Sequence, residues 1–184
     1  MLETPGLTSI ADLAQVRRVH LEESLAVVPL VERFDGFIVD VGSGGGAPGI
    51  PVAAALPDRE VTLLEANGRK CEFLESVARE FANVLVARGR AEEQPVDEYG
   101  VALAKALAPP PVAAEWCLPL VVPGGAAILL VGPSADAAAV ARVSKQLGGG
   151  EPEGHPGVLV LPKLEPTPPG FPRRSGTAKK RPLA

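Results

Sequence analysis

The chain has 184 residues, of which 46% are apolar and 22% charged, which predicts one folded domain and excludes a disordered chain. No apolar run approaches the roughly 20 residues of a membrane-spanning helix, and the acidic start Met1–Pro5 differs from a signal peptide. The cysteines, Cys71 and Cys117, lie far apart, as do the histidines, His20 and His155. We therefore expect a cytoplasmic protein with buried thiols and no metal site.

The charge is distributed unevenly along the chain. The net charge is −4, but residues 163–184 hold six cations and one acid, which gives +5 there and leaves −9 on residues 1–162. An acidic body with a basic end suggests a localised contact with a polyanion, while a charge run that only aids solubility is the alternative. The candidate RNA contacts are the cations nearest the end of the chain: Arg173, Arg174, Lys179, Lys180 and Arg181.

Apolar strand-like segments alternate with helical segments through the middle of the chain. The predicted buried strands cover residues 37–41, 61–64, 83–87, 99–104, 126–131 and 158–163. The predicted helices cover residues 8–32, 48–56, 67–82, 112–120 and 134–147. Asn67 and Ser134 are the expected N-caps, and Leu21, Leu25 and Val28 share one side of the first helix.

Strands separated by helices predict a doubly wound α/β domain with a mostly parallel sheet. This domain covers residues 1–164, with residues 1–35 as a helical part before the first strand. Pro123-Gly124-Gly125 predicts a turn, and the five prolines of residues 165–184 predict an irregular tail. In such sheets the ligand lies beyond the carboxyl ends of the strands, so the loops after four of the strands should surround one cleft.

The first loop of this cleft is rich in glycine. Asp40 precedes Gly42, Gly44 and Gly46, in a loop that follows a strand and opens a helix. Glycines there let a ligand lie against bare main chain. An acid two residues before the first glycine would repel a pyrophosphate, but it suits a ligand that carries an ammonium group, such as S-adenosylmethionine.

Two further segments predict parts of the same site. Glu65 ends the second strand, where an acid typically accepts hydrogen bonds from ribose hydroxyls. Gly89–Glu92 follows the third strand and would border an adenine. After the fourth strand, Lys105–Pro111 lacks the acid or amide and the aromatic residue that methyltransferases for exocyclic amines carry. An acceptor with a free lone pair, such as guanine N7, would need neither a base nor a nucleophile, only alignment.

These residues resemble a known family, the bacterial small-subunit ribosomal RNA methyltransferase G (glucose-inhibited division protein B). The resemblance runs through nearly the whole chain and is most specific in the glycine loop with its extension and in the basic end. The similar segments are Gly6–Ile10, His20–Leu25, Asp40–Pro51, Gly89–Glu93, Glu115–Leu120, Pro123–Gly125 and Thr167–Leu183.

The resemblance implies a class I methyltransferase fold and methyl transfer from S-adenosylmethionine to guanine N7 of 16S ribosomal RNA. By motif, it implies that Gly42 and Ala47 contact the cofactor from the glycine loop, that Ala91 and Glu92 lie near the adenine, and that Lys105 contacts the cofactor or positions the target. The expected partner is 16S RNA or the assembling small subunit, and the expected state is a monomer.

The chain departs from the family pattern at several points. Lys105 stands where the family has arginine, Glu65 where it has aspartate, and Ala47 where it has leucine. The helical part before the first strand is short, and residues 148–156 are turn-rich where the family has a strand, which predicts a shortened or missing edge strand. A methyltransferase for a small molecule or protein, and a non-catalytic nucleotide-binding module, are the alternative functions.

Overall fold

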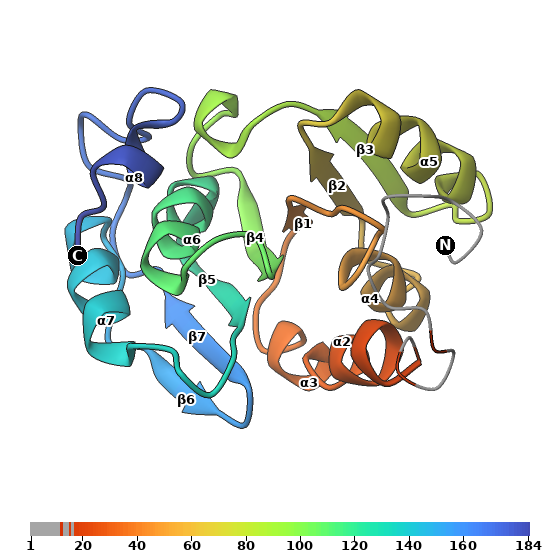
Figure 1. Cartoon of the computed structure of the whole chain (residues 1–184), viewed down its shortest axis with the longest axis horizontal. Helices are drawn as coiled ribbons and strands as arrows, with labels where there is room; N and C mark the ends of the chain where they lie inside the picture. Colours follow the sequence, from red (N-terminus) through yellow and green to blue (C-terminus); the bar gives the residue numbers. More distant parts are fainter. Residues whose placement is uncertain (1–11, 13–14, 16) are drawn as a thin grey trace.

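A seven-stranded sheet forms the centre of the computed structural model, which describes residues 12, 15 and 17–184 (Figure 1). The strand order is β3-β2-β1-β4-β5-β7-β6. The first five strands in this order are parallel, and β7 and β6 are antiparallel to their neighbours. The strands are β1 (Ile38–Val41), β2 (Val61–Glu65), β3 (Val84–Arg88), β4 (Tyr99–Lys105), β5 (Val121–Leu130), β6 (Glu153–His155) and β7 (Val158–Pro162). The predicted doubly wound, mostly parallel α/β fold is confirmed.

Helices cover both faces of this sheet (Figure 1). They are η1 (Arg17–Glu22), α2 (Glu23–Leu25), α3 (Val28–Val31), α4 (Gly49–Ala55), α5 (Gly68–Ala78), η2 (Ala91–Glu93), α6 (Pro110–Cys117), η3 (Leu118–Leu120), α7 (Ala137–Gln146) and α8 (Thr177–Lys180). The Asn67 side chain accepts hydrogen bonds from the amides of Arg69 and Lys70, so the predicted cap of α5 is confirmed.

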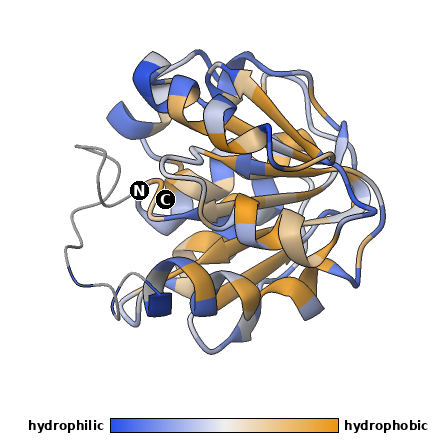
Figure 2. Cartoon of the chain, turned by 90° about the vertical axis from the view of Figure 1, so that its right-hand side faces the viewer, coloured by the Kyte–Doolittle hydropathy of each residue, from blue (hydrophilic) through white to orange (hydrophobic). Residues whose placement is uncertain are grey.

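The sheet separates two apolar cores, because successive strand residues point to opposite faces. Helices α3, α4 and α5 contribute to one core, in which Ile38 and Leu63 are fully buried. The other core contains Val39, Ala102, most of α6, and Val140 and Val143 of α7. Figure 2 shows the hydrophobic residues gathered on the strands and on the helix sides that face them. This burial on both faces explains why the strands are apolar runs without alternation.

Two local predictions were wrong. Pro123-Gly124-Gly125 is part of the long strand β5 and not a turn. The pairing of β5 with β4 shifts register there, Gly124 has a φ of +90°, and a side chain at Gly125 would collide with the backbone oxygen of Gly100. Glycine therefore serves a strand irregularity. The cap of α7 is Asp136, whose carboxylate accepts from the Ala139 amide at 2.9 Å, instead of Ser134.

The helical start of the domain also packs differently from the prediction. Helical residues run from Arg17 to Leu25 and from Val28 to Val31, with a turn between them, and the π-helical turn Arg17–Glu22 changes the spacing of side chains. Ser24, Val27 and Val31 are therefore the buried residues, while Leu21 and Leu25 are exposed. The earlier part of the predicted helix lies largely outside the described residues. None of the described helices is long and apolar enough to cross a membrane.

The end of the chain is more ordered than predicted. Strand β6 is only three residues long, so the edge strand is shortened but present. Residues 165–184 follow the surface beside α6 and contain the short helix α8, whose Ala178 is buried (Figure 1). These contacts with the domain could not be predicted from the local sequence, which is rich in prolines, glycines and cations.

Candidate functional site

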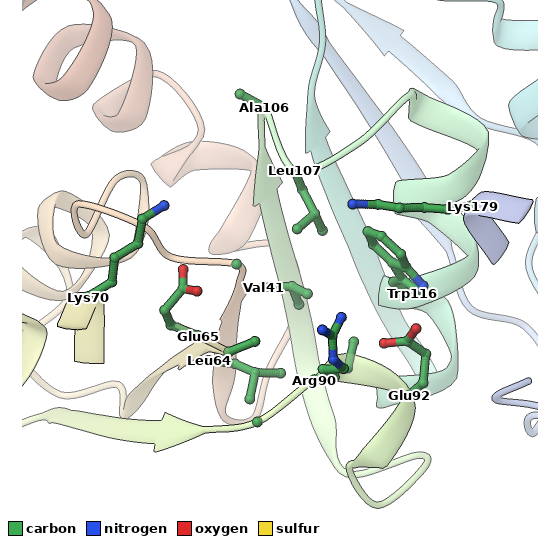
Figure 3. Close-up of a pocket in the computed structure, with 14 residues that line it drawn as sticks. Val41, Leu64, Glu65, Lys70, Arg90, Glu92, Ala106, Leu107, Trp116 and Lys179 are labelled. Carbon is green, nitrogen blue, oxygen red and sulfur yellow. The ribbon is translucent and has the colours of Figure 1, made fainter. Parts of the chain in front are cut away.

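The carboxyl ends of β1, β2 and β4 meet at a cavity of about 340 Å³, which we call the first cavity (Figure 3). This volume is within the usual range of small-ligand sites, and its position is the one expected for a doubly wound sheet. The lining residues come from the ends of β1 and β2, from four loops and from the helices α5, η2, α6 and α8: Val41, Gly42, Leu64, Glu65, Ala66, Lys70, Gly89, Arg90, Ala91, Glu92, Ala106, Leu107, Trp116 and Lys179.

The glycine loop is fixed by its own backbone. The amides of Gly42 and Ser43 both donate to the carbonyl of Leu64, at 2.8 and 3.2 Å, and the Gly46 amide donates to the Ser43 carbonyl. Gly42, Gly44 and Gly46 all have positive φ, which explains the choice of glycine. Gly42 lines the first cavity, while Gly44, Gly46 and Ala47 shape the loop outside its lining. Cofactor contacts by these three residues stay a prediction.

Asp40 lies beneath the loop. It is 1% exposed, and its carboxylate accepts a hydrogen bond from the Gly49 amide at 3.0 Å. A side chain at Gly49 would collide with Asp40 and Leu63, so this glycine lets α4 begin directly against β1. This packing shows how Asp40 holds the loop and α4 together. The carboxylate does not line the first cavity, so the predicted direct contact between Asp40 and an ammonium group stays a prediction.

Burial raises the pKa of Asp40 to about 7, against the opposing effect of the hydrogen bonds from Gly49 and Ser43. Between about pH 4 and 7 the unfolded chain loses this proton while the folded chain keeps it, so rising pH destabilises the fold across that window. We expect Asp40→Asn, which keeps an acceptor for Gly49, to remove this dependence. Between pH 4 and 8, urea unfolding should show the free energy of unfolding of the Asn variant rising relative to that of the unaltered chain by on the order of 4 kcal/mol. A difference that does not change with pH would contradict the raised pKa of Asp40.

Glu65 connects the glycine loop to the start of α5. Its carboxylate accepts from the Gly44 amide at 3.0 Å and from the Asn67 amide at 2.8 Å. These two bonds fix the side chain at the wall of the first cavity, where Figure 3 shows the carboxylate between Lys70 and Val41. Each Glu65 carboxylate oxygen has a second lone pair that can accept a hydrogen bond from a ribose hydroxyl, which is the contact predicted from the sequence.

The opposite wall comes from segments far apart in the sequence. Ala91 and Glu92, predicted to lie near the adenine, line the cavity together with Trp116 of α6 and Lys179 of α8. Lys179 and Trp116 were not predicted as parts of this site. No periodic pattern places a residue of the tail beside the third-strand loop, so only the fold reveals them. Lys70, on α5, was also missed.

Lys105 lies at a second cavity, of about 490 Å³, formed by the ends of β4 and β5, α2 and the start of β7. Its ammonium lies 2.9 Å from the carboxylate of Glu23, and its side chain is 13% exposed. Ala106 lines both cavities, so they adjoin at the end of β4. The predicted role of Lys105 in positioning a target fits this place; its predicted contact with the cofactor stays a prediction, since it does not line the first cavity.

The five predicted RNA contacts fall into two groups. Arg173 forms a bidentate ion pair with Glu115, which is 3% exposed on α6. Lys179 lies over the Trp116 ring, 5.2 Å from its centroid. Arg174, Lys180 and Arg181 are exposed, and their side chains form no ion pair with any described residue. The charge of Arg173 is already paired inside the domain, so the predicted RNA contact by Arg173 has no support in this geometry and stays a prediction.

The cysteines are buried, Cys71 in α5 and Cys117 at the end of α6. Burial raises the pKa of both thiols, which disfavours the nucleophilic thiolate. Neither lines the first or the second cavity. Among residues 12, 15 and 17–184, no group of three or more His, Cys, Asp or Glu side chains is arranged to hold a metal ion.

Comparison with known proteins identifies the family. The family model for rRNA small subunit methyltransferase G (GidB) matches residues 3–148. The chain belongs to this family. A relative named ribosomal RNA small subunit methyltransferase G, from Acetivibrio thermocellus, is 31% identical over 97% of this chain and 81% of its own length. A relative of the same name from Synechococcus elongatus is 37% identical over 97% of this chain and 82% of its own.

Solved structures support the fold alone. An S-adenosylmethionine-dependent O-methyltransferase from Thermotoga maritima has a TM-score of 0.65 at 15% identity, over 89% of this chain and 73% of its own. The CurJ carbon methyltransferase has a TM-score of 0.62 at 10% identity, over 84% and 59%. These neighbours share the class I methyltransferase fold that the resemblance implied. Their differing acceptors show that the fold alone leaves the substrate open.

Proposed function

We propose that this chain transfers a methyl group from S-adenosylmethionine to guanine N7 of 16S ribosomal RNA, as the family name indicates. Family membership supports ribosomal RNA as the substrate and S-adenosylmethionine as the cofactor. The observation that carries the proposal is the pair of adjoining cavities at the strand ends: the first fits a cofactor, and the second opens beside it at Ala106. A ribosomal substrate also makes the enzyme cytoplasmic in this proposal, and nothing in the fold requires more than a monomer.

The residues of the first cavity fit this cofactor, so we call it the cofactor cavity. Glu65 would accept the ribose hydroxyls, Gly42 would leave room for the ligand against bare main chain, and Ala91 and Glu92 would border the adenine. When bound, S-adenosylmethionine supplies an electrophilic methyl group on a sulfonium. The protein residues bind and orient it, and the loop hydrogen bonds keep the glycine backbone in place before the ligand arrives.

The second cavity fits an RNA nucleotide. Lys105 supplies a cation to its lining, and much of the rest of the lining is apolar: Ala26, Ala106, Leu130, Val131, Pro133 and Val158. A flipped base can pack on apolar side chains while a lysine pairs with a phosphate. Guanine N7 carries a free lone pair, so the chain needs no general base or nucleophile, which agrees with the lack of a reactive cysteine at either cavity.

Mapping of modified guanines tests this proposal. Ribosomal RNA from cells with and without the gene should differ by one N7-methylguanine in the 16S molecule, detected as a cleavage site after reduction and aniline treatment. Purified protein with S-adenosylmethionine should restore it, on naked 16S RNA or on small subunits from the deletion strain. Methylation at another atom, or transfer only to a protein or small molecule, would refute the proposed acceptor.

A further inference from the structure

The last residues of the chain contribute a wall to the cofactor cavity. Residues 171–184, which we call the C-terminal strap, lie beside α6 and reach the cavity with Lys179 (Figure 3). Their basic composition predicted an RNA tail, but Arg173 is paired with the buried Glu115, and Lys179, although exposed, lies over the Trp116 ring. RNA binding alone therefore does not explain the contacts of this segment.

The strap is held by a buried ion pair. Arg173 donates through Nε and Nη2 to the two oxygens of Glu115, and through Nη2 to the carbonyl of Arg181 at 2.9 Å. Arg173 therefore joins both ends of the strap to α6. Val112–Cys117 of α6 are buried against the sheet, α7 and α8, and Glu115 is only 3% exposed, so its carboxylate needs this partner. A pair this specific fixes one position of the strap.

A second set of contacts joins the strap to the adenine side of the cavity. The Gly176 amide donates to a carboxylate oxygen of Glu92 at 3.1 Å, and Gly176 has a φ of +80° that suits glycine. Ala178 is buried, and Lys179 lies on the Trp116 ring. Glu92, Trp116 and Lys179 all line the cavity, so the strap and the cofactor share neighbours.

We propose that the C-terminal strap is part of the cofactor site, with Lys179 contacting bound S-adenosylmethionine and Arg173 positioning the strap against Glu115. The proposal rests on the assignment of the cofactor cavity above. Figure 3 shows the Lys179 side chain extending across Trp116 toward Leu107, that is, into the cavity. The Trp116 N–H is buried without a hydrogen-bond partner among the described residues, which leaves a donor on the same wall.

The charges of S-adenosylmethionine determine how its affinity should change when Lys179 is removed. S-adenosylmethionine carries a sulfonium, an ammonium and one carboxylate, so a nearby cation without a contact would repel it. Loss of such a cation would raise the affinity of the cavity. A loss of affinity on removing Lys179 therefore indicates a contact with an acceptor of the ligand, such as its carboxylate or a ring nitrogen.

Calorimetry without RNA tests this contact. We expect Lys179→Gln to weaken S-adenosylmethionine and S-adenosylhomocysteine by about three- to tenfold each, and Lys179→Arg to restore most of the affinity. The matched control replaces the exposed Arg174, Lys180 and Arg181 with Gln, which should leave both affinities unchanged. Unchanged affinity in Lys179→Gln, or an equal loss in the control, would overturn the proposal. Failure of the unaltered chain to bind S-adenosylmethionine would instead overturn the proposed function.

A paired exchange tests the positioning role without leaving a buried charge. In the double variant Glu115→Gln, Arg173→Gln the two amides can still meet, but the ion pair is gone. We expect faster hydrogen exchange of the strap amides, above all at Gly176 and Arg181, together with about threefold weaker cofactor binding. Bound cofactor should slow that exchange again. Fast exchange with unaltered cofactor affinity would show that Arg173 only stabilises the fold.

Discussion

Gly42→Ala is expected to weaken S-adenosylmethionine binding by at least about tenfold while the domain stays folded. Gly42 lines the cofactor cavity and has a φ of +71°. A Cβ at this position would lie 2.4 Å from Cδ1 of Leu107, another lining residue. That atom must move, and the space next to it is the cavity. The new methyl group and the displaced Leu107 would both occupy ligand volume.

Gly44→Ala is the matched control for this prediction. Gly44 also has a positive φ, +56°, so alanine carries a similar backbone cost of about 1–2 kcal/mol. Its added Cβ would meet nothing closer than 3.7 Å, an ordinary contact. Titration calorimetry should therefore separate the two variants, while their melting temperatures fall alike. Unchanged affinity in both variants would show that the Gly42 side of the loop does not face the ligand, and an equal loss in both would show that Gly44 contacts the cofactor, as predicted from the sequence.

The part of the site that is local in sequence could be predicted. β2 is buried at every position, so its apolar run ends where Glu65 reaches the cavity. The glycine loop follows β1 directly, and its positive φ values explain why its sequence is rich in glycine. The Asn67 cap was predictable for the same reason, since a cap acts within three residues.

The rest depends on contacts between distant segments. Arg173 and Glu115 are 58 positions apart, and neither residue shows in its own neighbourhood that it is half of a buried pair. The composition of the tail therefore predicted a solvated, RNA-binding segment, although part of it packs on α6. Proline and glycine likewise predicted a turn at 123–125, because local turn signals do not reveal that a neighbouring strand accommodates the irregularity.

Asp40, the next-to-last residue of β1, illustrates a subtler limit of prediction from sequence. Its place before the glycine loop was predictable, but its burial was not, because the same sequence could present the carboxylate to a ligand. In the fold, the Asp40 carboxylate accepts a hydrogen bond from the Gly49 amide, and burial raises the pKa of this carboxyl group. The charge that the cofactor meets is thus set by residues at the cavity wall, Glu65 and Glu92 against Lys70, Arg90 and Lys179.

Lys105→Ala is expected to lower the rate of RNA methylation by about 100-fold, with much less effect on cofactor affinity. The lysine lines the second cavity and not the first, so its loss should misplace the RNA and leave the cofactor cavity intact. Lys105→Arg, which restores the residue usual in the family, should keep or raise the rate, because a guanidinium adds a planar fork for phosphate.

Glu23→Gln separates this role from the ion pair that Lys105 forms. The Glu23 carboxylate lies 2.9 Å from the Lys105 ammonium, so neutralising Glu23 removes this ion pair and keeps the cation. Single-turnover methylation should then stay within about threefold of the unaltered chain. If Lys105→Ala and Glu23→Gln slow the reaction equally, the pair acts as a structural link between α2 and β4. If Lys105→Ala weakens the cofactor as much as it slows transfer, Lys105 contacts the cofactor, as the family resemblance implies.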